Sequence, residues 1–299
     1  MTPAARTESP FRGTYTALVT PIRDGAIDWQ TLDVLVERQI EAGIDGVVPC
    51  GSTGESATLS HDEHDLVIET VVRRVAGRCK VLAGTGSNNT AEAVRLTQHA
   101  EKLGVDGALV VTPYYNRPTQ EGMFQHFSQV AAAVNFPIVL YNVPSRCSID
   151  LANETVRRLH DDHANIVAVK DASGGIDRVA ELAGPIGIDV LCGDDTFTLP
   201  MMALGAVGVI SVISNLTPEW MKKLVDAAAA GDFERARAWH HKACGLADAI
   251  GVLGPNPLPL KAAMAIKGLL CDEYRLPLCP MGPQEHSALE EILKRFELL

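Results

Sequence analysis

The stretch Ile166-Val167-Ala168-Val169-Lys170-Asp171 decides the fold expected for this chain. Four apolar, mostly β-branched residues run directly into a lysine, which is typical of a strand buried on both faces of a parallel sheet. The lysine would lie at the C-terminal end of that strand, where parallel barrels carry their chemistry. Burial against an apolar wall favours the neutral amine, which can attack a carbonyl to form a Schiff base. The alternative is a lysine whose amine simply leaves the sheet for water.

Similar short apolar runs recur along the chain roughly every 25 to 35 residues, with helical patterns between them. The expected strands are residues 14–19, 46–50, 80–83, 108–111, 138–141, 166–169, 190–193 and 207–211. This alternation predicts an α/β fold with a parallel sheet and right-handed crossovers. About eight repeats indicate a closed (β/α)8 TIM barrel rather than an open doubly wound sheet. Neither the glycines at 51–54 nor those at 84–86 complete a dinucleotide-binding G-x-G-x-x-G motif.

Helical periodicity alone continues from Pro218 to the end of the chain. Helices are expected at residues 218–230, 233–251, 258–270 and from 283 onward, with the Gly254-Pro255-Asn256-Pro257 break before the third. We therefore expect two domains, a catalytic barrel in residues 1–230 and a C-terminal α-helical domain in residues 231–299. The apolar faces of these last helices would cap the barrel or form a contact between subunits.

Local signals add three expectations about chain ends and helix starts. Ser60 and Glu63 form a capping-box signature for a helix that reaches about Ala76. Asn153 is expected to cap a helix that ends near His160. The polar residues 1–12 are expected to be a loose leader, and their first ten residues contain no apolar signal core.

Composition narrows the class of partner. The chain has 299 residues, a net charge of −11 and a sequence pI near 5.3, which argues against nucleic acid and anionic membranes. Its longest apolar runs are strand-length, far below the roughly 20 residues needed to span a bilayer. The seven cysteines are scattered and form no C-x-x-C pair. This favours a reduced, cytoplasmic setting and suggests neither a disulfide framework nor a zinc site.

The residues at the expected strand ends form a set suited to carbonyl chemistry. Lys170 is the candidate nucleophile, and the hydroxyls of Tyr115 and Tyr141 could pass protons. The stretch Gly51-Ser52-Thr53-Gly54 offers backbone N–H groups and two hydroxyls to a carboxylate. Arg146 could hold a second carboxylate through two parallel hydrogen bonds. Each residue alone could be a turn, a packing or a surface residue, but their position on one predicted face favours function.

Other chemistries fit less well. Phosphate sites in barrels usually involve the loops after strands seven and eight, and here Gly193-Asp194-Asp195 would repel phosphate. The stretch His61-Asp62-Glu63-His64 places two histidines on one face of a helix, but in an order that differs from the zinc-protease motif. A solvated helix start is the preferred interpretation of that stretch, so we expect no metal site.

Six ordered motifs support a resemblance from about residue 12 onward: GSTGESATL (51–59), AGTG (83–86), TPYYNRP (112–118), YNVPSR (141–146), VKD (169–171) and GDD (193–195). Together they resemble the dihydrodipicolinate synthase family, within the pyruvate-dependent class I aldolases that include N-acetylneuraminate lyase. The resemblance implies that Lys170 forms a Schiff base with pyruvate. The derived enamine would attack L-aspartate-4-semialdehyde to give 4-hydroxy-tetrahydrodipicolinate, in lysine biosynthesis through diaminopimelate. No cofactor is implied.

The resemblance also implies roles for the surrounding residues. Ser52, Tyr115 and Tyr141 match a proton relay in which Tyr115 reaches into the neighbouring subunit's site. Ser52 is usually threonine in the family, and the serine lacks the methyl group that restricts its rotamer. Four residues match substrate contacts: Thr53 with the carboxylate of pyruvate, Arg146 with that of the semialdehyde, and Gly193 and Ile210 in the pyruvate pocket.

A further set of residues matches the family's feedback site for L-lysine at a dimer interface. This set is Ser56, Ala57, His61, His64, Asn88, Glu92 and Tyr114. Glu92 could pair with the ammonium of lysine, and Asn88 could bond its carboxylate. The resemblance implies a homotetramer built as a dimer of dimers, with L-lysine as an inhibitor.

Two alternatives stay open. The chain could be another pyruvate-dependent aldolase, such as a sialate lyase or a lyase of keto sugar acids or hydroxyproline-derived keto acids. Sialate lyases share the Ser-Thr pair but lack an arginine at position 146, so Arg146 favours the synthase. The other alternative is a catalytically silent barrel that binds lysine. The intact Lys170, Tyr141 and Tyr115 argue against it.

Overall fold

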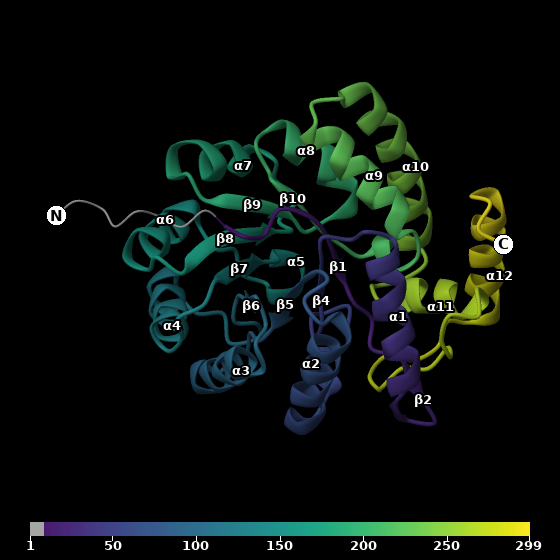
Figure 1. The fold of residues 1–299 in the computed structure, drawn as a ribbon, viewed down its shortest axis with the longest axis horizontal. Coiled ribbons are helices and arrows are strands. Elements are labelled where there is room, and N and C mark those ends of the chain that lie inside the picture. The colour runs from purple at the N-terminus through teal and green to yellow at the C-terminus, as the bar shows by residue number, and fades with distance from the viewer. Residues whose placement is uncertain (1–8) are drawn as a thin grey trace.

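Eight parallel strands close into a barrel in the computed structural model, which describes residues 9–299 (Figure 1). The strands follow one another round the barrel in chain order, and the last pairs with the first. They are β1 (Gly13–Ala17), β4 (Gly46–Val48), β5 (Lys80–Gly84), β6 (Gly107–Val111), β7 (Ile138–Asn142), β8 (Ile166–Asp171), β9 (Asp189–Cys192) and β10 (Gly208–Ser211). The expected TIM barrel is confirmed.

Helices connect successive strands and surround the barrel (Figure 1). They are α1 (Trp29–Glu41), α2 (His61–Val75), α3 (Thr90–Leu103), α4 (Gln120–Ala132), α6 (Asn153–Asp162), α7 (Asp177–Glu181), α8 (Thr198–Ala203) and α9 (Pro218–Ala229). Two features were not expected, the hairpin of β2 (Ile22–Arg23) with β3 (Ala26–Ile27) and the one-turn helix α5 (Pro144–Cys147). Both are too short to produce a periodic pattern in the sequence.

The two predicted helix starts have different outcomes. The capping box of α2 is confirmed, because the Ser60 hydroxyl accepts from the Glu63 N–H and the Glu63 carboxylate accepts from the Ser60 N–H. The predicted cap of α6 is wrong, because Ala152 occupies the capping position without a side-chain bond. Asn153 is instead the first helical residue, and its amide donates to the Glu181 carboxylate on α7.

The interior of the barrel is filled by an apolar cluster that extends down to Phe11. Phe11 is fully buried, and a side chain at Gly107, the first residue of β6, would collide with its ring. Phe11 therefore closes the barrel at the N-terminal ends of the strands. The prediction of a loose leader through Arg12 is wrong at this residue, because burying a large ring stabilises the fold. Residues 1–8 of that leader lie outside the described residues.

The C-terminal helices lie to one side of the barrel, beyond α1 and α9 (Figure 1). They are α10 (Phe233–Gly251), α11 (Leu258–Ile266) and α12 (Pro283–Arg295). Leu246, Leu260 and Leu289 are buried in the same apolar cluster as residues of the barrel and its helices. The helical extension is thus confirmed, and these leucines pack within the chain against the barrel and its helices. No helix within residues 9–299 is long and apolar enough to cross a membrane.

Candidate active site

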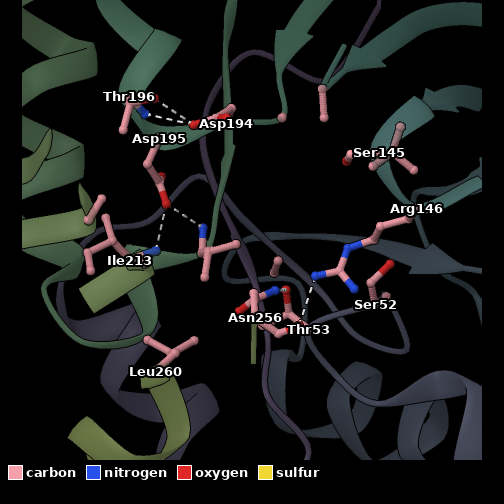
Figure 2. A pocket seen from close by; sticks show the side chains of 18 of the residues that line it. Ser52, Thr53, Ser145, Arg146, Asp194, Asp195, Thr196, Ile213, Asn256 and Leu260 are labelled. Carbon is pink, nitrogen blue, oxygen red and sulfur yellow. Dashed lines mark hydrogen bonds between the residues drawn. The ribbon is translucent and has the colours of Figure 1, made fainter. Parts of the chain in front are cut away.

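A cavity of about 520 Å3 opens at the C-terminal ends of the strands. It brings together six of the eight residues predicted for catalysis and substrate binding: Ser52, Thr53, Tyr141, Arg146, Lys170 and Gly193. Segments far apart in sequence contribute to it, from the loop after β4 to the stretch between α10 and α11 (Figure 2). These six residues from different strand ends therefore line one cavity, as expected from their positions in the sequence.

Lys170 and Tyr141 lie side by side because β7 and β8 pair in register, with Tyr141 opposite Lys170. The amine lies 4.0 Å from the centre of the tyrosine ring, and only 5% of the lysine is exposed. Among residues 9–299 this amine makes no hydrogen bond and no ion pair. A buried amine without a fixed partner is available to react with a ligand.

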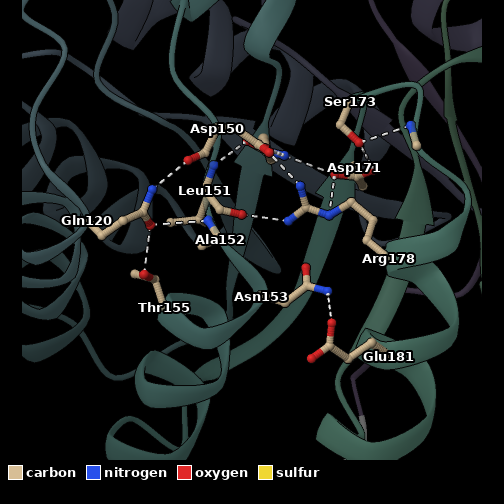
Figure 3. A network of polar contacts seen from close by, with 12 residues as sticks. Gln120, Asp150, Leu151, Ala152, Asn153, Thr155, Asp171, Ser173, Arg178 and Glu181 are labelled. Atoms are coloured by element: carbon tan, nitrogen blue, oxygen red, sulfur yellow. Dashed lines mark hydrogen bonds and ion pairs between the residues drawn. The ribbon is translucent and has the colours of Figure 1, made fainter.

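The next pair along the same strands, Asn142 and Asp171, points to the opposite face and anchors the strand ends. Figure 3 shows the polar network around Asp171. The Asn142 amide donates to Asp171 at 3.0 Å and to Asp150 at 2.7 Å. Arg178 from α7 donates to Asp150 at 2.8 Å, and Ser173 donates to the other oxygen of Asp171 at 2.8 Å. This network fixes the positions of the reactive pair on the inner face.

Gly193 leaves the space that the Lys170 side chain occupies. A Cβ atom at this position would lie 3.1 Å from Cε of Lys170 and 2.8 Å from the side chain of Ala172. Any larger residue at the end of β9 would therefore press on the lysine stem. The predicted role of Gly193 in the pocket has this steric basis.

Two further residues of the cavity belong to the carboxylate-binding side predicted from the sequence. Thr53 is buried, and its hydroxyl oxygen accepts a hydrogen bond of 2.9 Å from the Asn256 amide (Figure 2). Arg146 projects from α5, and its Nη2 donates to the carbonyl of Asn256 at 2.8 Å. Sequence reasoning missed Asn256, because the Gly-Pro-Asn-Pro stretch signalled only a break between helices.

Asp195 is a second cavity residue whose role the sequence did not indicate. Its carboxylate accepts from the backbone N–H groups of Val212 at 3.0 Å and Ile213 at 2.8 Å (Figure 2). Burial raises the pKa of this carboxyl group. Asp195 therefore ties the loop after β9 to the loop after β10.

Two predicted residues do not reach the cavity within one chain. Ile210 is fully buried in the same apolar cluster as Tyr141, while Val212 and Ile213 line the cavity above it. Tyr115 is 91% exposed and has a φ of +71°, in the left-handed region that is unusual for a bulky residue. An intramolecular site therefore contains the lysine and Tyr141 but not Tyr115.

A second cavity of about 600 Å3 adjoins the first, and the two share Ser52, Tyr141 and Arg146 as a common wall. Six of the seven residues predicted to bind L-lysine line it: Ser56, Ala57, His61, His64, Glu92 and Tyr114. Asn88 is not in this lining, and its carbonyl accepts from the Asn116 amide at 2.8 Å. The structure thus brings together in one cavity most of the residues predicted to bind L-lysine, which are spread over residues 56–114 of the sequence.

The charged and polar groups of the second cavity suit a cation. Glu92 is held by the Ser87 hydroxyl and by His61, and the Ser87 hydrogen bond is the main cause of its lowered pKa. Burial lowers the pKa of His64, which donates from Nε2 to the Gly84 carbonyl at 2.9 Å. A carboxylate in the lining of this cavity attracts an ammonium group. Within residues 9–299 no group of three or more His, Cys, Asp and Glu side chains is placed to hold a metal ion.

The sequence model of the Dihydrodipicolinate synthetase family matches residues 10–296. The chain belongs to this family. A 4-hydroxy-tetrahydrodipicolinate synthase of Geotalea daltonii is 50% identical over 291 residues, which are 97% of this chain and 100% of that protein. The chain is therefore an enzyme of the lyase class, as the resemblance implied.

Solved structures of the dihydrodipicolinate synthase family share the fold. The chloride-inhibited enzyme of Acinetobacter baumannii, complexed with pyruvate, has a TM-score of 0.93 and 42% identity. The match covers 96% of this chain and 99% of that one. The enzyme of Cyanidioschyzon merolae with lysine bound has a TM-score of 0.92 and 36% identity, over 97% of this chain and 99% of that one.

Proposed function

We propose that this chain condenses pyruvate with L-aspartate-4-semialdehyde to form 4-hydroxy-tetrahydrodipicolinate. One observation carries the proposal: an unpartnered, buried lysine shares a cavity with two groups that suit carboxylates, Thr53 and Arg146. Pyruvate has one carboxylate beside its ketone, and the semialdehyde has a second carboxylate. A nucleophile between two anion-binding groups matches this pair of substrates.

The chemistry begins at Lys170. The neutral amine attacks the keto carbon of pyruvate, and loss of water gives an imine. Loss of a proton from the methyl group of pyruvate gives an enamine, whose carbon forms a bond with the aldehyde carbon of the second substrate. The amino group of that substrate then attacks the imine carbon, so the ring closes and the lysine leaves.

The residues around Lys170 take the roles that these steps require. Tyr141 lies beside the amine and can exchange protons with the carbinolamine and the enamine. Ser52, which lines the same cavity, can extend this relay. Thr53 is the contact of the pyruvate carboxylate and Arg146 that of the semialdehyde carboxylate, while Gly193 and Ile210 shape the pyruvate pocket.

Tyr115 completes the relay from a neighbouring subunit in this proposal. An aromatic ring that is 91% exposed and held at a positive φ is costly in an isolated chain, and such strain is concentrated at functional positions. We therefore assign Tyr115 to the site of a partner copy within a dimer, and two dimers to a tetramer. Measurement of the mass in solution together with the turnover of Tyr115→Phe tests this assignment.

A coupled assay with pyruvate and L-aspartate-4-semialdehyde tests the proposed reaction, and borohydride trapping with pyruvate accompanies it. Turnover with a trapped adduct is the expected result. An adduct without turnover of the semialdehyde would overturn the proposed substrate and indicate another pyruvate aldolase. Absence of both would indicate a catalytically silent barrel.

We also propose that L-lysine inhibits the enzyme by binding in the second cavity. Support comes from the carboxylate of Glu92, which Ser87 and His61 hold in this cavity, and from the shared wall that joins this cavity to the active site. The expected result is loss of turnover at millimolar L-lysine. Substitution of Glu92→Gln removes the charge that attracts the ammonium group and should weaken inhibition about 10-fold or more, with little change in uninhibited turnover. Unchanged inhibition of that variant would count against the site.

A further inference from the structure

Building on the proposed function, we propose that Asn256 is a positioning residue that presents the Thr53 hydroxyl to the carboxylate of pyruvate. Asn256 lies in the stretch between α10 and α11, 203 positions from Thr53 in the sequence. It lines the catalytic cavity and contacts both carboxylate-binding residues (Figure 2). No motif used to assign the catalytic residues includes it.

The hydrogen bond from Asn256 sets the direction of the Thr53 hydroxyl. A threonine hydroxyl has one hydrogen to donate and two lone pairs to accept with. The Asn256 amide donates to this oxygen at 2.9 Å and occupies a lone pair. The hydroxyl hydrogen then remains for another acceptor, and a carboxylate in the cavity is such an acceptor. Thr53 is only 4% exposed, so water does not compete freely for this hydrogen.

The two contacts of Asn256 use different parts of the residue, and a substitution can separate them. Its side chain contacts Thr53, whereas its backbone carbonyl accepts from Arg146 at 2.8 Å. Truncation of the side chain removes the first contact and leaves the second acceptor in place. A change at Asn256 should therefore affect pyruvate more strongly than the semialdehyde.

An independent contact ties the same loop to the C-terminal helices. Lys261 on α11 is fully buried and forms an ion pair of 2.5 Å with Glu55, two residues after Thr53. Glu55 has a φ of +54°, and it also accepts from the Arg275 N–H at 3.2 Å. Strained backbone persists where its surroundings hold it. The helical extension thus fixes the loop after β4 at Glu55 and orients the Thr53 hydroxyl through Asn256.

The amide oxygen of Asn256 argues against a purely structural role. Within residues 9–299 this oxygen is buried and has no hydrogen-bond partner. An unsatisfied buried oxygen destabilises the fold, so an apolar residue of similar size would serve packing better. Such an apolar residue would lack the amide N–H that donates to Thr53, so this hydrogen bond is the reason for an asparagine here.

The test is a titration of borohydride trapping with pyruvate, followed by intact mass, on Asn256→Ala, Thr53→Val and the double variant. Asn256→Ala is expected to raise the pyruvate concentration at half-maximal trapping about 10-fold, because the Thr53 hydroxyl is no longer directed at the carboxylate of pyruvate. The double variant should bind pyruvate no more weakly than Thr53→Val alone, since Asn256 acts through that hydroxyl. The KM for the semialdehyde should change less than about threefold, because Arg146 keeps its backbone partner.

A second variant and a matched control show whether weaker pyruvate binding reflects the Asn256 amide or a general loss of structure. Asn256→Asp has the same shape but cannot donate and adds a negative charge, so pyruvate binding should weaken more than in Asn256→Ala. Asn153→Ala removes a hydrogen bond on α6, outside both cavities, and should leave pyruvate binding unchanged. Unchanged pyruvate affinity in both Asn256 variants, or additive losses in the double variant, would overturn the role of Asn256 but leave the proposed function intact. A wild-type chain that never forms an adduct would overturn the proposed function, and this inference with it.

Discussion

Two buried lysines, Lys170 and Lys261, differ in what surrounds their amines. Both lie over a tyrosine ring, at 4.0 Å from Tyr141 and 4.7 Å from Tyr274. The Lys261 amine also bonds to the Thr20 and Glu273 carbonyls and to the Glu55 carboxylate. The Lys170 amine has no such partner within residues 9–299. Lys261, whose amine has three acceptors, therefore has a structural role, whereas the amine of Lys170, which lies beside the Tyr141 ring, is free to react.

The same contrast separates two arginines. Arg275 holds Glu63 through two parallel hydrogen bonds of 2.6 Å and also donates to the Thr58 carbonyl. Within residues 9–299 the Arg146 guanidinium makes one hydrogen bond, to the Asn256 carbonyl. A guanidinium has five donors, so Arg146 keeps most of them for a ligand. The two cations that we assign to substrates, Lys170 and Arg146, therefore have few partners, whereas Lys261 and Arg275 have several.

The largest expected effect comes from removing the unpartnered lysine. Lys170→Ala should abolish borohydride trapping and lower turnover by more than about 100-fold, the lower end of what a positioned catalytic group contributes. Its thermal unfolding should stay close to that of the wild type, because no hydrogen bond or ion pair is lost. Near-wild-type turnover of this variant would show that the free lysine is not the nucleophile.

Removal of Lys261, whose amine has three hydrogen-bond acceptors, should lower the stability of the fold instead. Lys261→Met leaves the Glu55 carboxylate buried without its partner and should cost about 3–5 kcal/mol in urea unfolding. Adding Glu55→Gln removes the orphaned charge and should recover part of that loss. If the single variant were as stable as the wild type, the contrast between the two lysines would fail.

Arg146→Ala tests the arginine that keeps its donors free. Pyruvate trapping should be retained, and kcat/KM for the semialdehyde should fall about 10- to 100-fold, as expected for hydrogen bonds to a charged group. Parallel measurement of trapping and of turnover separates the two half-reactions. Equal losses in both would indicate that Arg146 supports the site generally and does not bind the second substrate.

The smallest effect is expected at the ion pair of Glu63 with Arg275, and its contribution to stability depends on pH. The Arg275 hydrogen bonds lower the pKa of Glu63 from its ordinary 4.5 to about 2. The folded state therefore binds fewer protons, so this contribution is present above about pH 4.5 and is lost as the pH falls toward 2. Glu63→Gln should lower stability by about 1 kcal/mol or less at neutral pH, a gap that closes in acid. Unfolding by urea across this pH range measures the gap, with the exposed pair Glu154–Arg157 as a control that shows almost none.

Sequence patterns determined much of the architecture. Apolar runs such as residues 166–169 predicted the strands, and motifs such as 141–146 indicated the family and six of the eight residues predicted for catalysis and substrate binding that line the cavity. These signals are local, because strand burial and helix periodicity depend on neighbours within a few turns. Short features escaped, such as the one-turn helix that carries Arg146, and Phe11 was assigned to a leader because one aromatic residue makes no pattern.

The sequence by itself determined that Lys170 ends a buried strand and that polar groups follow the neighbouring strands. Only the tertiary structure decided which buried lysine is saturated, because the carboxylate that pairs with Lys261 lies 206 positions away. It also decided that Asn256 meets Thr53 and that the two cavities share a wall. Hydrogen-bond partners are set by closure of the barrel and docking of the helices, which bring distant residues together with no trace in local composition.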